Sequence, residues 1–358
     1  MSASPRNLTL AAALAAMAAL GSLPGLSFAA ATPNADGEVI PTDEAAAIQA
    51  VTDAIATSVK AGFDKNGNAF RDAHRKAHGC VQARFTVLNQ LPATAAQGLF
   101  ATPKAYDAVI RFSNGSGAAA DDHQADGRGM AIKVLGVPGA KLLDDEASAS
   151  TQDFVMINHP VFFVRNAADY VSFQKSLGGG GLPAAGWLAA HLFHEVPIIF
   201  ATANKKLLNP LNSRYWSMVP YKLGTTQMKY SAQPCAGGTF IETSDTADRL
   251  RDNLVAQLAA GSACFDFKVQ PRTKATQPIE DPTIEWKESA APFVTVARIE
   301  VPKQTPESAE ACEVRSFTPW HSIEAHRPLG GISRVRKAVY QKISTLRHEL
   351  NGQPRVEP

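Results

Sequence analysis

Two arginines bracket a tyrosine near the C-terminus of the 358-residue chain: Arg336 precedes Tyr340 by four residues, and Arg347 follows it by seven. A spacing of four places Arg336 and Tyr340 on one face of a helix, one turn apart. A phenol with an ordinary pKa of about 10 is neutral at physiological pH, and a positive charge within about 4–6 Å favours its ionised form. The pattern therefore predicts an ionised tyrosine that can act as a metal ligand.

Four further segments combine basic, hydroxyl and aromatic residues in a fixed order. They read R-K-A-H-G at 75–79, V-I-R-F-S at 109–113, D-G-R-G-M-A-I-K at 126–133 and N-H-P-V-F-F-V-R at 158–165. A histidine near an arginine, or a basic helix with one tyrosine, is on its own most often a solvated surface feature. The order of the whole set is what carries the functional information.

In this order and at these separations, the segments resemble the haem-binding half of the catalase superfamily. That family has an R-x-x-H motif, a V-R-F-S strand, a D-x-R-G-x-A-x-K strand, an N-x-P-x-F-F segment and a C-terminal R-x-x-x-Y-x-x-x-x-x-x-R helix. The first four matches span roughly residues 70–175. Because the chain is short, it more closely resembles the small, divergent catalase-like haem proteins of bacteria, of the catalase-related peroxidase type.

The resemblance implies haem b as cofactor, with Tyr340 as the ligand of its iron. By the family's pattern, His78 is the distal acid/base and Ser113 its hydrogen-bonding neighbour. Ile157 stands where the family has its distal asparagine, and Asn158, which falls one place late, is kept with His78 and Ser113 as a candidate catalytic residue. The remaining residues implied to contact haem or line its pocket are Arg75, Arg111, Phe162, Phe163, Tyr170, Arg336 and Arg347.

The implied activity is that of an oxidoreductase: a haem peroxidase, or a weak catalase, acting on hydrogen peroxide or organic hydroperoxides with an unidentified electron donor. The apolar Ile157 and Val161 keep a second reading open, an enzyme that converts fatty-acid hydroperoxides. A haem-binding protein without turnover and a globular protein without haem also stay open. If Tyr340 points away from the haem, His321 and His326 are the nearest alternative ligands.

These residues need a scaffold, and the pattern of the chain predicts an α+β fold. Short β-type runs at 83–88, 108–112, 129–134 and 153–164 are separated by turn-rich segments. A helix that begins near Thr42 is expected to end at Gly62, and a basic amphipathic helix is expected from Ser333 to about Asn351. With the resemblance, this implies a catalase-like antiparallel β-barrel with flanking helices. The haem would be buried between barrel and C-terminal helix, in one domain over residues 32–358.

The N-terminus reads as a signal peptide over residues 1–31. Arg6 is the only charged residue before Asp36, an apolar run covers 8–20, and an A-x-A-like site follows at 29–31. The apolar run is shorter than the roughly 20 residues of a membrane span, although a retained anchor stays open. The sequence therefore predicts a periplasmic or secreted protein without a membrane span in the mature chain.

The charge and the cysteine content limit which kinds of partner and metal site the sequence supports. The formal net charge is +2, from 35 basic and 33 acidic residues, which gives no reason to expect nucleic acid. The four cysteines show no zinc-site spacing and permit three disulfide pairings, with one structural disulfide or none expected. A small-molecule partner is expected, and the sequence leaves the oligomeric state open.

Overall fold

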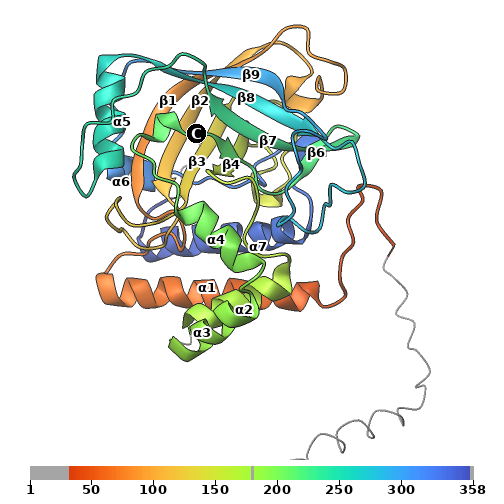
Figure 1. Cartoon of the computed structure of the whole chain (residues 1–358), viewed down its shortest axis with the longest axis vertical. Helices are drawn as coiled ribbons and strands as arrows, with labels where there is room; N and C mark the ends of the chain where they lie inside the picture. The colour runs from red at the N-terminus through yellow and green to blue at the C-terminus, as the bar shows by residue number, and fades with distance from the viewer. Residues whose placement is uncertain (1–31, 179–180, 355–358) are drawn as a thin grey trace, which may run out of the picture. The chain divides into compact units, whose positions relative to one another are not determined.

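The computed structural model describes residues 32–178 and 181–354. Residues from Pro33 onward form one compact unit, in which a β-barrel is flanked by helices (Figure 1). The predicted signal peptide, residues 1–31, lies outside the described residues.

A sheet of nine antiparallel strands dominates the described chain, in the order β5-β4-β3-β2-β1-β9-β8-β7-β6. A further pairing between β5 and β7 closes eight of these strands into a barrel and leaves β6 as the hairpin partner of β7. This closure confirms the predicted antiparallel barrel. The strands are β1 (Ala77–Val87), β2 (Ala105–Asn114), β3 (Arg128–Leu135), β4 (Thr151–Ile157), β5 (Tyr215–Trp216), β6 (Tyr221–Leu223), β7 (Thr226–Pro234), β8 (Ala263–Pro271) and β9 (Val294–Val301).

Aromatic side chains fill the interior of the barrel. The ring of Phe154 on β4 lies 4.7 Å from that of Phe267 on β8 and 5.1 Å from that of Tyr230 on β7, between centroids. An eight-stranded barrel is just wide enough for such side chains, and alternate residues of each strand face in and out. Because the interior is packed, the polar residues that alternate with this core face outward, toward the helices.

Helices α1 (Glu44–Asn66) and α7 (Gly331–Leu350) lie side by side against the outside of the barrel (Figure 1). Val51 and Ile55 of α1 share an apolar cluster with Val335 and Ile343 of α7. This contact buries the apolar stripe of the predicted C-terminal helix. The other α-helices of the described chain are α2 (Ala167–Gly178), α3 (Gly181–Ala190), α4 (Glu195–Ala203), α5 (Arg249–Ala260) and α6 (Ala309–Glu313).

The first helix runs past Gly62, so the predicted end at this residue is wrong. Nothing lies within 4 Å of the place where a Cβ of Gly62 would stand, so neighbouring packing does not interrupt the helix there. The helix ends at Gly67 instead, whose φ of 68° is left-handed and whose N–H donates to the carbonyl of Phe63. A glycine in this conformation is the usual C-terminal stop of a helix.

Arg334 ties the start of α7 to the N-terminal segment. Its guanidinium contacts the carboxylates of Glu38 at 2.7 Å, Glu44 at 2.6 Å and Glu280 at 2.9 Å. Burial alone would raise the pKa of Glu38, but hydrogen bonds from the Gly330 N–H and from Arg327 lower it overall. These charged contacts fix the position of the start of α7 along the barrel, and hence the position of Tyr340 on this helix.

Two disulfides join all four cysteines, so the expectation of one disulfide or none is wrong. Cys80 on β1 pairs with Cys312 on α6, with a Cα–Cα distance of 5.4 Å. Cys235 at the end of β7 pairs with Cys264 on β8, with a Cα–Cα distance of 5.6 Å. The first bridge attaches the short helix α6 to the outer face of the barrel.

Removing the Cys80–Cys312 bridge should cost more stability than removing the Cys235–Cys264 bridge. The bridges close loops of 232 and 29 residues, and a longer loop restricts the unfolded chain more. On this entropy argument, Cys80→Ser/Cys312→Ser should lower the free energy of unfolding by about 2 kcal/mol more than Cys235→Ser/Cys264→Ser. Urea denaturation of both double variants measures the difference. Equal losses, or the reverse order, would contradict the long-range role of the first bridge.

Candidate active site

A row of three residues crosses the outer face of β2, β3 and β4. The register pairs Ser113 with Gly129, and Gly129 with Ile157. Directly paired residues of neighbouring strands lie on the same face of the sheet. The turn that precedes β1 carries His74 onto this row.

The backbone of His74 is held in a left-handed conformation, with φ of 59°. Its N–H donates to the carbonyl of Gly115 at 3.0 Å, and its own carbonyl accepts from Nη2 of Arg111 at 2.8 Å. A residue with a side chain keeps this conformation only where its surroundings hold it. These contacts therefore fix the imidazole over β3.

The imidazole of His74 pairs with the hydroxyl of Ser113, with 3.1 Å between Nδ1 and Oγ. A Cβ on Gly129 would stand 2.5 Å from this same Nδ1, so the ring fits only because residue 129 is glycine. Burial lowers the pKa of His74 to about 4, and the positive charge of Arg111 acts in the same direction. The result is a neutral imidazole whose Nε2 is the nitrogen left to exchange a proton with a substrate.

His78 lies elsewhere, and the prediction that it is the hydrogen-bonding neighbour of Ser113 is wrong. His78 is the extra residue of a β-bulge in β1, because Ala77 pairs with Ser113 while Gly79 pairs with Phe112. Among the described residues, neither ring nitrogen of His78 has a hydrogen-bond partner. Burial lowers the pKa of His78, and the charged group that opposes this shift most is Asp122. The ring therefore belongs to a polar cluster at Asp122, away from Ser113.

The arginine of the distal motif is displaced in the same way. The segment R-D-A-H-R-K-A-H contains the R-x-x-H pattern twice, as Arg71–His74 and as Arg75–His78. The guanidinium of Arg75, which the resemblance implies to contact haem, stacks on the ring of Phe70, with 3.7 Å to its centroid. The first copy, four residues earlier than predicted, occupies the site. Only the position of Ser113 and Gly129 in space distinguishes the two copies.

Three arginines converge on one carboxylate, that of Glu313 at the end of α6. Arg71 forms an ion pair with it, Nη1 of Arg347 lies 3.2 Å from its Oε1, and Nη2 of Arg111 lies 3.6 Å from its Oε2. Burial lowers the pKa of Arg111 to about 9 and that of Arg347 to about 10, and the charge of Arg71 adds to both shifts. The structure thus brings together Arg111 and Arg347, as predicted, around an acid that the sequence did not single out.

Tyr340 and Arg336 lie on one face of α7, as the spacing of four residues predicts. Nη2 of Arg336 donates to the phenol oxygen of Tyr340 at 3.4 Å, and the guanidinium is 5% exposed. Burial alone would lower the pKa of Arg336, but the phenols of Tyr340 and Tyr221 raise it overall. Among the described residues, Nη1 of Arg336 has no hydrogen-bond partner, so the group carries unused hydrogen-bonding capacity.

An aromatic wall flanks this region, made of Phe162, Phe163, Tyr170, Phe173 and Trp187. The rings of Phe162 and Phe163 stack at 4.6 Å, and Tyr170 meets both at 6.0 Å and 5.8 Å. Phe173 lies 4.9 Å from Phe163 and 5.1 Å from Trp187. The three predicted lining residues therefore form one cluster, which α2 and α3 extend.

The predicted catalytic role of Asn158 does not fit its contacts. Its side-chain oxygen accepts from the N–H of Arg128 at 2.8 Å, and its own N–H donates to the carbonyl of Arg128 at 2.9 Å. The side-chain oxygen and the backbone N–H of Asn158 thus both bond the backbone of Arg128, the first residue of β3. The place in the row beside His74 is taken by Ile157, because successive strand residues face opposite sides.

The other histidines considered as ligands are engaged elsewhere. Nε2 of His326 accepts from the N–H of Leu99 at 2.9 Å. Nδ1 of His321 lies 3.0 Å from the carboxylate of Asp153, and its Nε2 contacts Glu146. Both rings are therefore committed to structural contacts.

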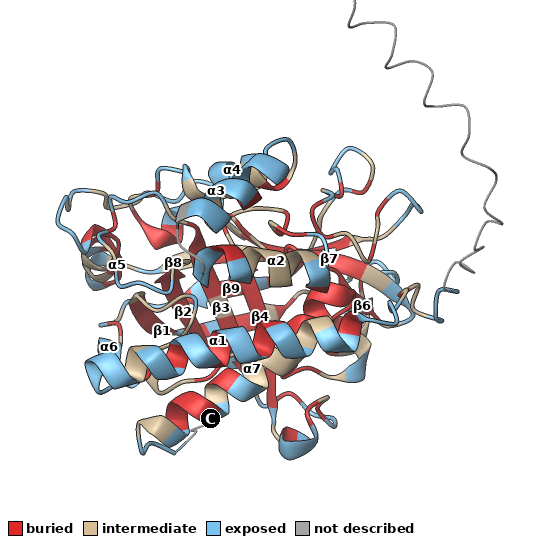
Figure 2. Ribbon diagram, turned by 90° about the horizontal axis from the view of Figure 1, so that it is seen from below, coloured by how far each residue is buried: buried red, intermediate tan, exposed pale blue. Residues whose placement is uncertain are grey.

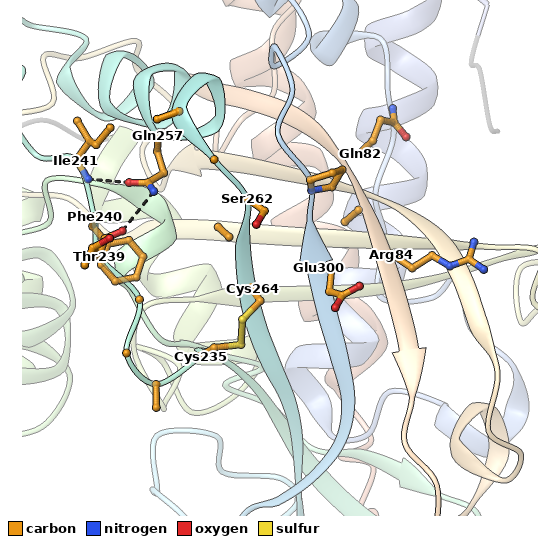
Figure 3. Close-up of a pocket in the computed structure, with 18 of the residues that line it drawn as sticks. Gln82, Arg84, Cys235, Thr239, Phe240, Ile241, Gln257, Ser262, Cys264 and Glu300 are labelled. Atoms are coloured by element: carbon orange, nitrogen blue, oxygen red, sulfur yellow. Dashed lines mark hydrogen bonds between the residues drawn. A yellow bond between two sulfur atoms is a disulfide. The ribbon is translucent and has the colours of Figure 1, made fainter.

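A broad hollow of about 1160 Å³ opens on another part of the barrel (Figure 3). It lies beside the Cys235–Cys264 bridge, where Gln257 donates to the carbonyl of Thr239 and accepts from the N–H of Ile241. Its lining includes Arg84 and Glu300 but neither His74 nor Tyr340. Its lining contains no histidine or tyrosine, whereas His74 and Ser113 pair on the outer face of β2–β4, so the chemistry points to that face.

Two sequence comparisons show what this chain is similar to. A sequence profile of the Catalase family matches residues 29–179. The catalase-related peroxidase of Mycolicibacterium paratuberculosis is 27% identical over 270 residues, which are 70% of this chain and 81% of that protein.

Solved catalases share the fold. A fungal catalase and catalase A from Saccharomyces cerevisiae are each 18% identical to this chain, with a TM-score of 0.62. The match covers 82% of this chain but only 63% and 65% of theirs, less than two thirds of either. A bacterial catalase at 17% identity, also with a TM-score of 0.62, matches over 94% of this chain and 67% of its own. The chain is therefore a divergent catalase-like protein.

Proposed function

We propose that the chain is a haem-dependent peroxidase that acts on hydroperoxides, with at most weak catalase activity. Tyr340 would ligate the iron, and His74, rather than His78, would be the acid/base. The observation that carries the proposal is the cluster of Arg71, Arg111 and Arg347 around a single carboxylate. A flat ring with two carboxylates and a central ferric ion would find both its counter-charges and its axial ligand on this face.

The donor set fits haem better than a metal ion bound by protein side chains alone. Among the described residues, no group of three or more His, Cys, Asp or Glu could hold a metal ion. The arginines instead suit the two propionates, the only anionic groups on the edge of the ring. Arg336 would stabilise the phenolate form of Tyr340 as ligand. The unpartnered Nη1 of Arg336 offers a further donor to an anionic group.

The chain's own residues would handle the proton of the substrate. When bound, haem would supply the redox-active iron that peroxide chemistry requires. Neutral His74 accepts the proton of the hydroperoxide at Nε2 and returns it to the departing oxygen, so that water or an alcohol leaves. The Ser113 hydroxyl holds the ring in place during this exchange, and Gly129 leaves it room.

The residue beside His74 favours peroxidase over catalase chemistry. Ile157 offers no hydrogen bond where the resemblance expects an amide to orient a second peroxide molecule. The aromatic wall, together with Ile157, favours a second candidate, the conversion of fatty-acid hydroperoxides. Product analysis with hydrogen peroxide and with a lipid hydroperoxide separates the two.

The two overlapping motifs provide a matched pair of variants. His74→Gln should lower kcat/KM for a hydroperoxide by about a hundredfold or more, the usual scale for a lost acid/base. His78→Gln should keep most of the activity, because this ring has no contact with Ser113. Steady-state peroxidase assays of the two holoproteins measure the effect, with thermal unfolding as a check on folding. A larger loss in His78→Gln would reverse the assignment, and a wild-type rate no higher than that of free haem would indicate a binding protein without turnover.

The axial ligand can be tested by spectroscopy. Phenolate-ligated ferric haem has a charge-transfer signature, which Tyr340→Phe should abolish because phenylalanine has no ligand atom. Tyr170→Phe is the control, since it removes a phenol from the same aromatic wall and should leave the signature in place. An unchanged spectrum in Tyr340→Phe would show that another residue binds the iron.

The position of Glu313 predicts an effect on haem affinity. Its carboxylate already neutralises Arg71, Arg111 and Arg347, so it would compete with the propionates. Glu313→Gln should therefore bind haem more tightly, by about tenfold, or about 1.4 kcal/mol. Haem titration of the apoprotein measures this, and Glu310→Gln, an exposed acid on the same helix, is the control. Unchanged or weaker binding in Glu313→Gln would place the propionates elsewhere.

A further inference from the structure

Helices α3 and α4, with the end of α2, expose large apolar side chains. We call this surface the apolar ridge; Figure 2 shows α3 largely in the colour of exposed residues and α4 in a mixture of exposed and intermediate colours. Phe193, between them, is 94% exposed, and Leu182, at the start of α3, is 88% exposed. Such contiguous apolar exposure usually marks a surface that contacts something other than water. The other members are Leu177, Leu188, Leu192 and Phe200.

Side-chain hydrogen bonds attach the helices of the ridge to neighbouring parts of the folded chain. Trp187 of α3 donates from Nε1 to Oγ of Ser172 on α2 at 3.1 Å, and its ring stacks on that of His191 at 4.1 Å. His194, which precedes α4, bonds Oγ1 of Thr283 through Nε2 at 2.8 Å. The helices are therefore anchored by their polar and aromatic groups, and their leucines and phenylalanines face outward.

The exposed charged residues within the chain segment that forms the ridge are basic. Between Asp169 and Glu242 the sequence contains a single acid, Glu195. That side chain is 1% exposed and lies 3.0 Å from the guanidinium of Arg165. Lys175 and Lys206 are exposed beside the apolar side chains. The chain segment that forms the ridge thus presents apolar groups, exposed lysines and a single acid that is buried, which complements an anionic surface.

The geometry suits a surface rather than a crossing. Among the described residues no single helix is long and apolar enough to span a membrane, and α3 and α4 pass that test only as a pair bent by 106°. They have 10 and 9 residues, against about 20 for a span. Apolar side chains on short helices with lysines at their edge are typical of segments that lie in the headgroup region.

We propose that the apolar ridge docks this protein on an anionic phospholipid surface. Phe193 and Leu182 would insert among the acyl chains, while Lys175 and Lys206 meet lipid phosphates. A second copy of the chain fits less well, because an isologous two-fold contact pairs this surface with itself and so offers Lys175 and Lys206 no anionic group from the same patch. The proposal does not depend on haem. It does connect the aromatic wall, through Trp187 and Phe173, to the surface from which an apolar hydroperoxide would arrive.

Vesicle binding by the full chain tests the proposal. Phe193→Ser/Leu182→Ser should lower affinity for phosphatidylcholine vesicles containing phosphatidylglycerol by about tenfold or more, since two apolar side chains are lost. Ile40→Ser removes an exposed apolar side chain of the N-terminal segment, outside the ridge, and should bind as the parent does. Omitting phosphatidylglycerol or raising the salt concentration should weaken binding of the parent.

A local probe separates docking through the ridge from binding through any other part of the chain. In Phe193→Trp, brominated lipids should quench the added fluorescence, relative to the parent protein. Vesicle-bound protein without this quenching would overturn the proposal, as would equal affinity of the ridge and control variants. Sedimentation without lipid reports the competing occupant: a dimer that the ridge substitutions dissociate would assign the surface to a second copy instead. None of these readouts uses peroxidase activity, so the proposal can fail while the proposed function stands.

Discussion

Four guanidinium groups withdrawn from water on one side of the barrel need anionic partners, and this need organises the site. Arg111, Arg336 and Arg347 are at most 5% exposed, and the side chain of Arg71 is 15% exposed. An unpaired buried cation costs several kcal/mol, on the order of what a whole domain has to spare. The carboxylate of Glu313 lies close to three of these charges, and the phenol of Tyr340 accepts a hydrogen bond from the fourth, that of Arg336. A dianionic ring bound through a phenolate would satisfy the same requirement.

The barrel and its helices serve to bring these charges together from distant parts of the chain. Arg71 lies in the turn before β1, Arg111 on β2 and Arg347 on α7, so no local segment could form the cluster. The aromatic interior keeps β2 rigid, and the contacts of Arg334 fix the start of α7 against the N-terminal segment. The Cys80–Cys312 bridge holds α6, and with it Glu313, at the point where the three arginines meet.

The sequence predicted those parts of the site that follow a regular repeat. Helical spacing placed Arg336 beside Tyr340, and the resemblance pointed to Arg111 and Ser113, which alternate residues of β2 carry on one face. The predictions from sequence failed where the backbone departs from regular helix or strand geometry. The left-handed His74 and the bulge at His78 decide which of two overlapping R-x-x-H motifs meets Ser113, and neither can be read from residue types. Glu313 was missed because it matches no motif and acts only through tertiary contacts. The barrel was predicted as a fold, but its closure by the two-residue strand β5 was not.

The neutral state of His74 has a consequence for substrate choice. A buried imidazole that stays unprotonated down to a pH of about 4 adds no charge to its surroundings, and Ile157 beside it adds no hydrogen bond. Under the proposed function, the distal side of the site would therefore discriminate through shape and apolar contact, which would favour a hydroperoxide with an organic tail over a small polar one. The aromatic wall continues this apolar character from Phe163 to Trp187, beneath the apolar ridge. Site and surface thus favour the same substrate class on independent grounds, since the ridge depends on exposure and charge sign and the site depends on the residues around His74.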